Sequence, residues 1–391
     1  MENGRVLVFS SREICYYSGN FFANQLASAF EEIGYWAELC ELSKGEDFDQ
    51  KLAPYMEKEY EVIVDFNSLL PRLVLDDGSY YLDHLNGPFF DYILDHPLFH
   101  YAGLTSDASN LHVLVLDESH QTYAQKYYPK LSGVHMLPLG ATQGVYQGKK
   151  LHADRILFLG TYDTTDHIKA LIEQAPAQRQ AVMRHLIERR IAQPLLPMEE
   201  AFLDYLGERE IKLDAEAFAL AMNEMYPVDA YVRDYFREKA VETLLAGHIP
   251  VVAVGEGWEK FKTPHQRFLT TEKAVTFSLS FEKIARESAL LNAFPVFHHG
   301  MHDRIAAGMA NRTVVLTDRN PYLEKHFTDE KQLCFYDLNR PESLLEKADR
   351  LLSDAPLRER IGREAYENFS ENHTWKKRAQ QILKLAALYR R

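Results

Sequence analysis

The N-terminal stretch alternates between short apolar runs and a segment whose apolar residues recur at helical spacing. Arg5-Val6-Leu7-Val8-Phe9 is rich in β-branched residues and predicts a strand. After a polar loop from Ser10 to Gly19, apolar residues follow a helical period from Asn20 until Gly34 ends it, and Tyr35–Leu39 is again strand-like. A strand, a helix and a strand within roughly 35 residues predict a right-handed βαβ crossover and a parallel sheet.

The alternation continues along the chain and breaks once, at Gly140–Lys150, where glycines without periodicity predict a linker. A long helical stretch is expected over about 165–235, and a last helix over Thr374–Tyr389. Two doubly wound α/β domains therefore account for the pattern. Their further strands are expected at Val62–Val64, Val113–Leu116, Val134–Leu137, Arg155–Leu159, Ile249–Val254, Ala274–Phe277 and Thr313–Thr317.

The composition narrows the class of protein. The chain has 391 residues, enough for two or three domains, and its 46% hydrophobic and 26% charged residues are typical of globular proteins. A formal net charge of −13, from 44 basic and 57 acidic side chains, argues against nucleic acid as a partner. The three scattered cysteines, Cys15, Cys40 and Cys334, predict neither a disulfide framework nor a zinc site. We see no secretory signal and no transmembrane segment, and expect a soluble cytoplasmic protein.

In proteins built from two doubly wound domains, ligands bind beyond the carboxyl ends of the strands, in the crevice between the halves. The loops that directly follow strands are therefore the places to search for function. Six segments meet this criterion: Ser10–Gly19, Asp65–Ser68, Asp117–His120, Gly160–Thr161, Gly255–Trp258 and Asp318–Pro321.

The densest group of chemistry-bearing residues lies between a strand expected to end near Val296 and a helix beginning near Asp303. Backbone N–H groups at a helix start favour an anion, and Arg304 adds a fork of donors suited to a diphosphate. His298 and His302 could hydrogen-bond the same oxygens. In the alternative interpretations, the histidines are exposed loop residues and Arg304 pairs with Glu324, or His298, His299 and His302 bind a metal, for which no further ligand is evident.

The stretch from His302 to Asn311, followed by Thr313-Val314-Val315-Leu316-Thr317-Asp318, resembles the donor-site signature of CgeB-like glycosyltransferases. The family pattern is roughly Gly-Leu-His-Glu-Arg-x-Phe-Glu-Ala-Met-Ala-Cys-Gly, followed by a strand that ends in Thr-Asp. The resemblance extends in weaker form over Arg155–Arg391. Val64–Ser68 and Leu94–Leu98 resemble acceptor-domain segments of bacterial members.

The resemblance implies a GT-B fold, in which two Rossmann-like domains face each other across a cleft. Residues 1–147 would form the acceptor domain, 148–370 the donor domain with the helical insertion, and 371–391 a last helix that packs back on the first domain. The implied activity moves a sugar from a nucleoside-diphosphate sugar to a hydroxyl of a glycan or of a protein such as a surface protein. It requires no metal or other cofactor. The sequence leaves the sugar, the base, the stereochemical outcome and the oligomeric state open.

The chain departs from the family pattern in two places, and the second concerns the ribose of the donor. The family's His-Glu-Arg is His302-Asp303-Arg304 here, and the Glu that normally precedes Ala-Met-Ala is Ala307. In related retaining enzymes that Glu is the second acid of a Glu-x7-Glu pair, whose first position falls on His299. Because neither acid is present, Glu324 is the candidate substitute for the ribose contact.

Three further segments are donor-site candidates because each follows a strand. Gly160-Thr161 could aim free N–H groups at a phosphate, although a plain βα turn is the simpler interpretation. Gly255 leaves room for a base or a diphosphate, and Trp258 could stack on a ring, with a tight turn and a half-buried Trp as the alternative. Asn320 completes the predicted donor set.

Asp95 and His96 are the first candidates for the catalytic base. They lie in an aromatic-rich stretch, Phe89–Tyr101, that we expect to be loop-like. A carboxylate or an imidazole within hydrogen-bond reach can deprotonate the acceptor hydroxyl as it attacks C1 of the sugar. Asp65 and His120 are the next candidates. In the structural alternative, Asp95 caps a turn and His120 caps the helix that follows it.

Other motifs argue against competing classes of enzyme. Asp47-Phe48-Asp49 matches the Asp-x-Asp metal motif of the other glycosyltransferase fold, but lies in a polar stretch and predicts a surface segment. The chain has no Gly-x-Ser-x-Gly elbow, no Walker loop and no Gly-x-Gly-x-x-Gly fingerprint. Two alternative functions stay open: a nucleotide-sugar epimerase of the same architecture, and a non-catalytic glycan-binding or spore-coat-like protein.

Overall fold

All but one of the apolar runs predicted as strands are strands in the computed structural model, which describes residues 4–11, 18–43, 46–56 and 58–390. The middle of the predicted Ser10–Gly19 loop, with Cys15, lies outside these residues. The chain divides into two compact units. The first unit comprises Met1–Gly140, Leu213–Asn223 and His373–Arg391, and the second comprises Ala141–Lys212 and Glu224–Asn372.

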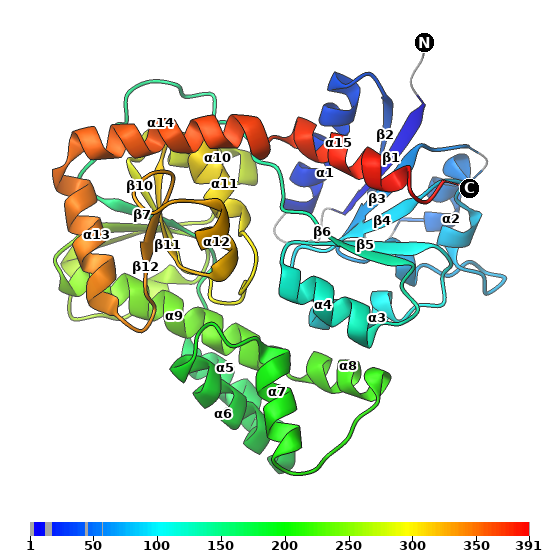
Figure 1. The fold of residues 1–391 in the computed structure, drawn as a ribbon, viewed down its shortest axis with the longest axis horizontal. Helices are drawn as coiled ribbons and strands as arrows, with labels where there is room; N and C mark the ends of the chain where they lie inside the picture. The colour runs from blue at the N-terminus through cyan, green and yellow to red at the C-terminus, as the bar shows by residue number, and fades with distance from the viewer. Residues whose placement is uncertain (1–3, 12–17, 44–45, 57, 391) are drawn as a thin grey trace. The chain divides into compact units, whose positions relative to one another are not determined.

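A six-stranded parallel sheet of order β2-β1-β3-β4-β5-β6 forms the core of the first unit (Figure 1). Helices cover such sheets on both faces, so the inner strands are continuous apolar runs rather than alternating ones. Every residue of β3, β4 and β5 is accordingly buried. The strands are β1 (Arg5–Ser11), β2 (Trp36–Leu42), β3 (Val62–Phe66), β4 (Phe89–Tyr92), β5 (Leu111–Val115) and β6 (Gly133–Met136).

The strand β4 corrects the expectation of a loop over Phe89–Tyr101. Its four residues, Phe89-Phe90-Asp91-Tyr92, are all buried and pair with β3 on one side and β5 on the other. Aromatic residues suit a pleated surface that is covered on both faces, and a strand of four residues is too short to show a period. The loop begins only after Tyr92.

The last helix packs against the first helix of the same unit. Trp375 at the start of α15 lies 5.7 Å from the ring of Phe22 in α1, and Lys376 pairs with Glu32 at 2.8 Å. Thr374 caps the N-terminus of α15. The helices of this unit are α1 (Ser18–Glu32), α2 (Phe48–Leu52), α3 (Tyr101–Leu104), α4 (Glu118–Tyr127), α8 (Ala215–Glu224) and α15 (Trp375–Ala386), with 3₁₀ turns at Ala53–Tyr55, Leu70–Arg72, Tyr81–His84 and Pro97–His100.

A second six-stranded parallel sheet, of order β12-β11-β10-β7-β8-β9, forms the core of the second unit. The predicted strand Ala274–Phe277 is wrong, because the edge strand runs over Leu269–Glu272 and Phe277 begins a helix. The predicted strand end near Val296 is also displaced, to Asn292. The strands are β7 (Ile156–Leu159), β8 (Val251–Val254), β9 (Leu269–Glu272), β10 (Ala289–Asn292), β11 (Val314–Asp318) and β12 (Cys334–Tyr336).

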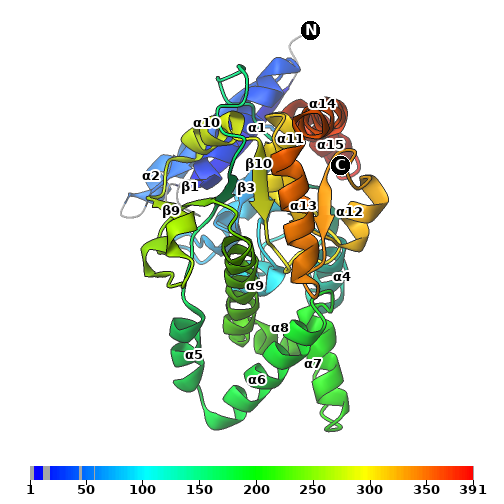
Figure 2. The same ribbon diagram turned by 90° about the vertical axis from the view of Figure 1, so that its left-hand side faces the viewer.

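The long helix α9 (Tyr226–Ala246) packs against α5 and α6 and leads to the sheet. Figure 2 shows α5, α6 and α7, which we call the helical segment, grouped at the bottom of the view. None of the helices in the described part of the chain is long and apolar enough to cross a membrane. The remaining helices are α5 (Thr165–Glu173), α6 (Ala177–Ala192), α7 (Met198–Gly207), α10 (Phe277–Arg286), α11 (Asp303–Ala310), α12 (Pro321–His326), α13 (Pro341–Ser353) and α14 (Ala355–Asn372), with 3₁₀ turns at Trp258–Lys260 and Gln266–Phe268.

The expected fold class is confirmed. The chain contains two parallel α/β sheets of six strands each, flanked by helices, in the arrangement expected of two Rossmann-like domains. In each sheet the loops at the carboxyl ends of the strands carry the polar residues singled out above.

Candidate functional site

The loops after β7 and β8 touch each other through their backbones at the carboxyl edge of the second sheet. A Cβ atom added to Gly255 would lie 2.1 Å from the carbonyl oxygen of Gly160, and one added to Gly257 would lie 2.1 Å from that of Tyr162. Gly255 has a φ of 156° and Gly257 a φ of 88°, which residues with a side chain rarely adopt. Both glycines are therefore required for the close approach of the two loops.

Trp258 holds this contact together, which corrects its predicted role. Its indole N–H donates to the carbonyl oxygen of Gly160 at 2.8 Å, and its ring stacks on Tyr162 at 4.8 Å. The side chain is only 1% exposed. A ring buried in this position cannot stack on a ligand. Trp258 instead supports the Gly160–Thr161 turn through its hydrogen bond to the Gly160 carbonyl oxygen.

Arg304 lies in the first turn of α11, and its side chain reaches the Gly160–Thr161 turn. One of its NH groups donates to the Asn292 side-chain oxygen at 2.7 Å, at the end of β10. Its guanidinium carbon lies 5.3 Å from the centroid of Phe158, and the other terminal nitrogen lies 3.2 Å from where a Gly160 Cβ would be. Gly160 thus leaves space for the guanidinium. The side chain is buried.

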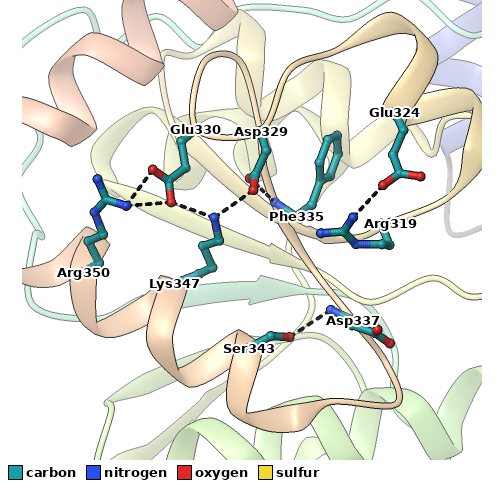
Figure 3. A network of polar contacts seen from close by, with 9 residues as sticks. All are labelled: Arg319, Glu324, Asp329, Glu330, Phe335, Asp337, Ser343, Lys347 and Arg350. Atoms are coloured by element: carbon teal, nitrogen blue, oxygen red, sulfur yellow. Dashed lines mark hydrogen bonds and ion pairs between the residues drawn. The ribbon is translucent and has the colours of Figure 1, made fainter.

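The alternative interpretation, in which Arg304 pairs with Glu324, is not what the described residues show. Glu324 pairs instead with Arg319 at 2.6 Å, and both side chains are exposed (Figure 3). Figure 3 shows this pair beside a separate surface network in which Lys347 bridges Asp329 and Glu330. Engaged with Arg319 at the surface, Glu324 is poorly suited to the predicted contact with a donor ribose.

Arg237 on α9 is the residue that sequence reasoning missed. One of its NH groups donates to the carbonyl oxygen of Thr161 at 3.0 Å and to the Asp234 carboxylate at 3.1 Å. Its guanidinium carbon lies 6.0 Å from the centroid of Phe158. The guanidinium carbons of Arg237 and Arg304, which we call the arginine pair, therefore both lie within 6.0 Å of the centroid of one aromatic ring. The only hint in the sequence was an Asp-x-x-Arg spacing on a helix.

The arginine pair could hold an anion, because both members are charged and have spare donors. Burial lowers the pKa of Arg237 to about 9 and also lowers that of Arg304, so both guanidinium groups are charged at neutral pH. The Nε of Arg237 has no hydrogen-bond partner within the part of the chain that the structure describes. A guanidinium carries five N–H donors, and the contacts above use only some of them. An oxyanion at this edge can accept the rest.

The segment before α11 is fixed by side chains rather than left open. His302 caps α11, its Nδ1 accepting from the Arg304 backbone N–H at 3.2 Å, and burial lowers the pKa of its imidazole to about 4. The amide nitrogen of Asn320 donates to the carbonyl oxygens of Phe297 and Gly300 at 3.0 and 3.1 Å. Asn320 thus positions this loop, instead of contacting the donor as predicted.

His298 contacts a buried arginine of the helical segment. Arg190, at the end of α6, is 0% exposed and lies 3.5 Å from His298 Nε2 and 3.4 Å from the Asp229 carboxylate. Its Nε has no hydrogen-bond partner among the residues described. The buried Arg190 side chain therefore connects the helical segment to the loop that precedes Arg304, through its contact with His298.

We expect replacing Arg190 with alanine to lower the free energy of unfolding by about 2 kcal/mol, because the buried Asp229 carboxylate loses its cation. Urea unfolding measures this. Arg189→Ala is the matched control, because the neighbouring Arg189 is partly exposed and pairs with Asp204 at the surface. It should change the stability by no more than about 0.5 kcal/mol. Equal effects of the two variants would contradict a role for the buried contact.

In the first unit, the structure brings His96 close to His120. His96 is buried, its Nδ1 accepts from the Leu98 N–H at 3.0 Å, and its ring lies 4.5 Å from that of His120. His96 therefore caps the turn that follows. His120 does not cap α4, because Asp117 accepts from the first N–H groups of that helix. Asp95 is the more accessible of the two predicted bases, being only half-buried.

Asp65 and Asp91 form a buried carboxylate pair on neighbouring strands of the first sheet, where they are register partners. Burial and repulsion by Asp91 raise the pKa of Asp65 to about 8. The pair accepts N–H groups from the turn after β3: Asp65 from Leu70 at 2.7 Å and Asp91 from Ser68 at 2.8 Å. Ser68 has a φ of 59°. Asp65 thus holds a strained turn, and is less suited to act as the base.

The raised pKa of Asp65 makes the stability of wild type fall with pH. The protonated carboxyl is favoured in the folded state. Its contribution to stability is therefore complete below about pH 4 and is lost as the pH rises through about 8. Asp65→Asn removes that loss. We expect the stability of the variant relative to wild type to rise by at least about 1 kcal/mol from pH 5 to pH 9. Urea unfolding at each pH measures it, and the exposed Asp49→Asn should show no slope. A difference in stability between Asp65→Asn and wild type that does not change with pH would contradict the raised pKa of the buried Asp65.

The comparisons with known proteins agree with this architecture. A family model described as "Glycosyl transferase-like" matches residues 233–384, a range that contains both members of the arginine pair. A comparison with curated protein sequences finds no significant match.

Solved structures similar to this chain cover almost all of it. Sucrose-phosphate synthase from Thermosynechococcus elongatus has a TM-score of 0.56 at 11% identity, over 99% of each chain. A glycosyltransferase from Rickettsia africae has 0.55 at 9% identity, over 99% of this chain and 98% of that one. An alpha-glucosyltransferase solved with UDP-glucose and DNA has 0.55 at 11% identity, over 98% and 100%. At these identities the likeness shows the fold, which is GT-B.

Proposed function

We propose that this chain is a metal-independent, CgeB-like glycosyltransferase that takes its sugar from a nucleoside-diphosphate sugar. The observation that carries the proposal is the arginine pair beside Phe158 at the carboxyl edge of the second sheet. The glycosyltransferase family model that spans both arginines supports it. The alpha-glucosyltransferase of similar fold was solved with UDP-glucose, so UDP-sugars are the first donors to test.

The arginine pair supplies the electrostatic part of the proposed reaction. When the bond between the sugar and the diphosphate breaks, negative charge grows on the leaving diphosphate. Two preorganised guanidinium groups with little exposure to water stabilise that charge more strongly than water does. The Thr161 carbonyl and the Asn292 side chain hold the two guanidinium groups in place before the substrate arrives. In this mechanism the two arginines stabilise the leaving diphosphate, and no metal ion is assigned to that task.

On the acceptor side, we keep Asp95 as the proposed base for the attacking hydroxyl. His96 and His120, buried against each other, support the loop that carries it. Asp95→Asn should lower kcat by at least about 100-fold while nucleotide binding stays unchanged. The acceptor would be a glycan or a hydroxyl of a protein.

A thermal-shift screen of nucleoside diphosphates, followed by an assay of diphosphate release from the matching sugar donors, tests the proposed function. We expect one nucleotide to raise the melting temperature and its sugar donor to release the diphosphate, faster with an acceptor mixture. Chelation of divalent cations with EDTA should leave the rate unchanged. Release of a free sugar or an epimer without any acceptor would point to an epimerase. No stabilisation by any nucleotide and no release from any donor would refute an enzymatic role.

A further inference from the structure

A hollow of about 320 Å³ lies in the second unit, away from the arginine pair. It is lined by the segment 146–150, by the C-terminal ends of α10 and α11, and by the first residues of α14. We call it the linker pocket. Figure 1 shows the segment before β7 passing over α10 and α14. Its volume is at the lower end of the range for small-ligand sites. Four cations line it, Lys149, Lys150, Arg312 and Arg358, with a single carboxylate, Glu359.

Lys150 is held by neutral groups. Its Nζ donates to the carbonyl oxygens of Ala285 and Asn311 at 2.9 and 2.7 Å, and to the Thr313 hydroxyl at 2.7 Å. Burial lowers the pKa of this amine to about 7, while the nearby Glu287 carboxylate acts in the opposite direction and Arg312 adds to the lowering. The usual remedy for a desolvated ammonium is a neighbouring anion, which would restore its charge.

The two arginines of the pocket are also held without a carboxylate. Arg358 donates to the carbonyl oxygens of Leu351 and Leu352, at the C-terminal end of α13. The guanidinium of Arg312 lies 3.9 Å from the centroid of the Tyr366 ring. Carbonyl groups and an aromatic face fix the positions of these cations, but they leave their formal charge uncompensated.

A group of cations without carboxylate partners is unusual in a chain with a net charge of −13. Other cations of the same unit have carboxylate partners, as in Arg155 with Glu287 at 2.6 Å and Arg319 with Glu324 at 2.6 Å. For the four cations of the linker pocket, the described part of the chain contributes no such ion pair. Positive charge gathered around one hollow, in an acidic protein, is what an anion site requires.

We propose that the linker pocket binds a small phosphate-bearing ligand, with Lys149 and Arg358 as the cations that still have N–H groups to donate to it. The phosphate group can belong to a free small molecule or to a lipid headgroup, because the recognising chemistry is the same. Val145 and Leu151 flank the lining segment and are 90% and 57% exposed, which would suit the edge of a lipid surface. The site is independent of the proposed transferase activity and of the arginine pair.

Isothermal titration of the full chain with inorganic phosphate tests the site. Lys149 is exposed and Glu359 is the one acid of the lining, so opposite charge changes at these residues should have opposite effects. Lys149→Glu should weaken phosphate binding by at least about tenfold, and Glu359→Gln should strengthen it by about threefold. Lys273→Glu, an equal charge change at an exposed lysine outside the pocket, is the control. Phosphate binding should persist in Arg304→Ala, which separates this site from the arginine pair.

Co-sedimentation with phosphatidylcholine vesicles, with and without phosphatidic acid, distinguishes the two sources of phosphate. Binding to the acidic vesicles that Lys149→Glu abolishes would identify a lipid headgroup. Binding of free phosphate without any gain from phosphatidic acid would identify a small soluble ligand. The proposal is overturned if wild type binds neither probe, if Lys149→Glu behaves like Lys273→Glu, or if Arg304→Ala alone removes all phosphate binding.

Discussion

Replacing Arg304 with alanine should weaken nucleoside-diphosphate binding by about 100-fold, which corresponds to about 2.7 kcal/mol. The substitution removes a buried, charged fork of donors from the proposed diphosphate site. Arg304→Lys keeps the charge but loses the fork, so we expect it to fall between the alanine variant and wild type. Isothermal titration with the nucleotide that stabilises wild type measures the affinities. Thermal unfolding of each variant shows whether the fold is intact.

The matched control is Arg319→Ala, because Arg319 is an exposed arginine of the same unit that pairs with Glu324. It should bind the nucleotide like wild type. Unchanged affinity in Arg304→Ala would show that the diphosphate lies elsewhere. That result differs from a failure of the proposed function, in which wild type itself binds no nucleotide.

Arg237→Ala extends the same experiment to the second member of the arginine pair. Both guanidinium groups lie within 6.0 Å of the Phe158 ring centroid, so their effects on nucleotide affinity should be coupled. We expect the double variant to lose less than the sum of the single losses, as residues that share one ligand group do. Additive losses would place the two arginines on separate parts of the ligand.

Gly255→Ala should lower the free energy of unfolding by about 4 kcal/mol, the largest stability effect we expect of a single methyl group. The new Cβ would lie 2.1 Å from the Gly160 carbonyl oxygen, and the backbone has a φ of 156°. Neither the steric conflict nor the conformation can relax without separating the loops after β7 and β8. Urea unfolding measures the loss. Nucleotide binding should weaken with it, because the Gly160–Thr161 turn carries the Arg237 contact.

Gly207→Ala is the control for this substitution. A Cβ added to Gly207, at the end of α7, meets no atom within 4 Å. The variant should be as stable as wild type, or more stable by about 0.5 kcal/mol, because alanine is the better helix former. A Gly255→Ala variant as stable as wild type would show that the two loops do not make the backbone contact described here.

Much of the fold follows from local pattern, and the errors have physical causes. The Arg5–Phe9 and Arg155–Leu159 runs are strands, because a short continuous run of apolar residues suits a strand that is buried on both faces of a sheet. Strand β4 was missed because four aromatic and acidic residues show no period, and Ala274–Phe277 was assigned wrongly because a short apolar run also suits a helix start.

By itself, the sequence determined the two parallel α/β sheets and the position of Arg304 at a helix start. Both depend on residues that are neighbours along the chain. Only the tertiary structure decided that Arg237 joins Arg304 at Phe158, that Trp258 is buried, and that Glu324 turns to Arg319. Periodicity shows which side of an element is buried, but not which distant element buries it. The partners of a long side chain are set by packing between segments far apart in the sequence.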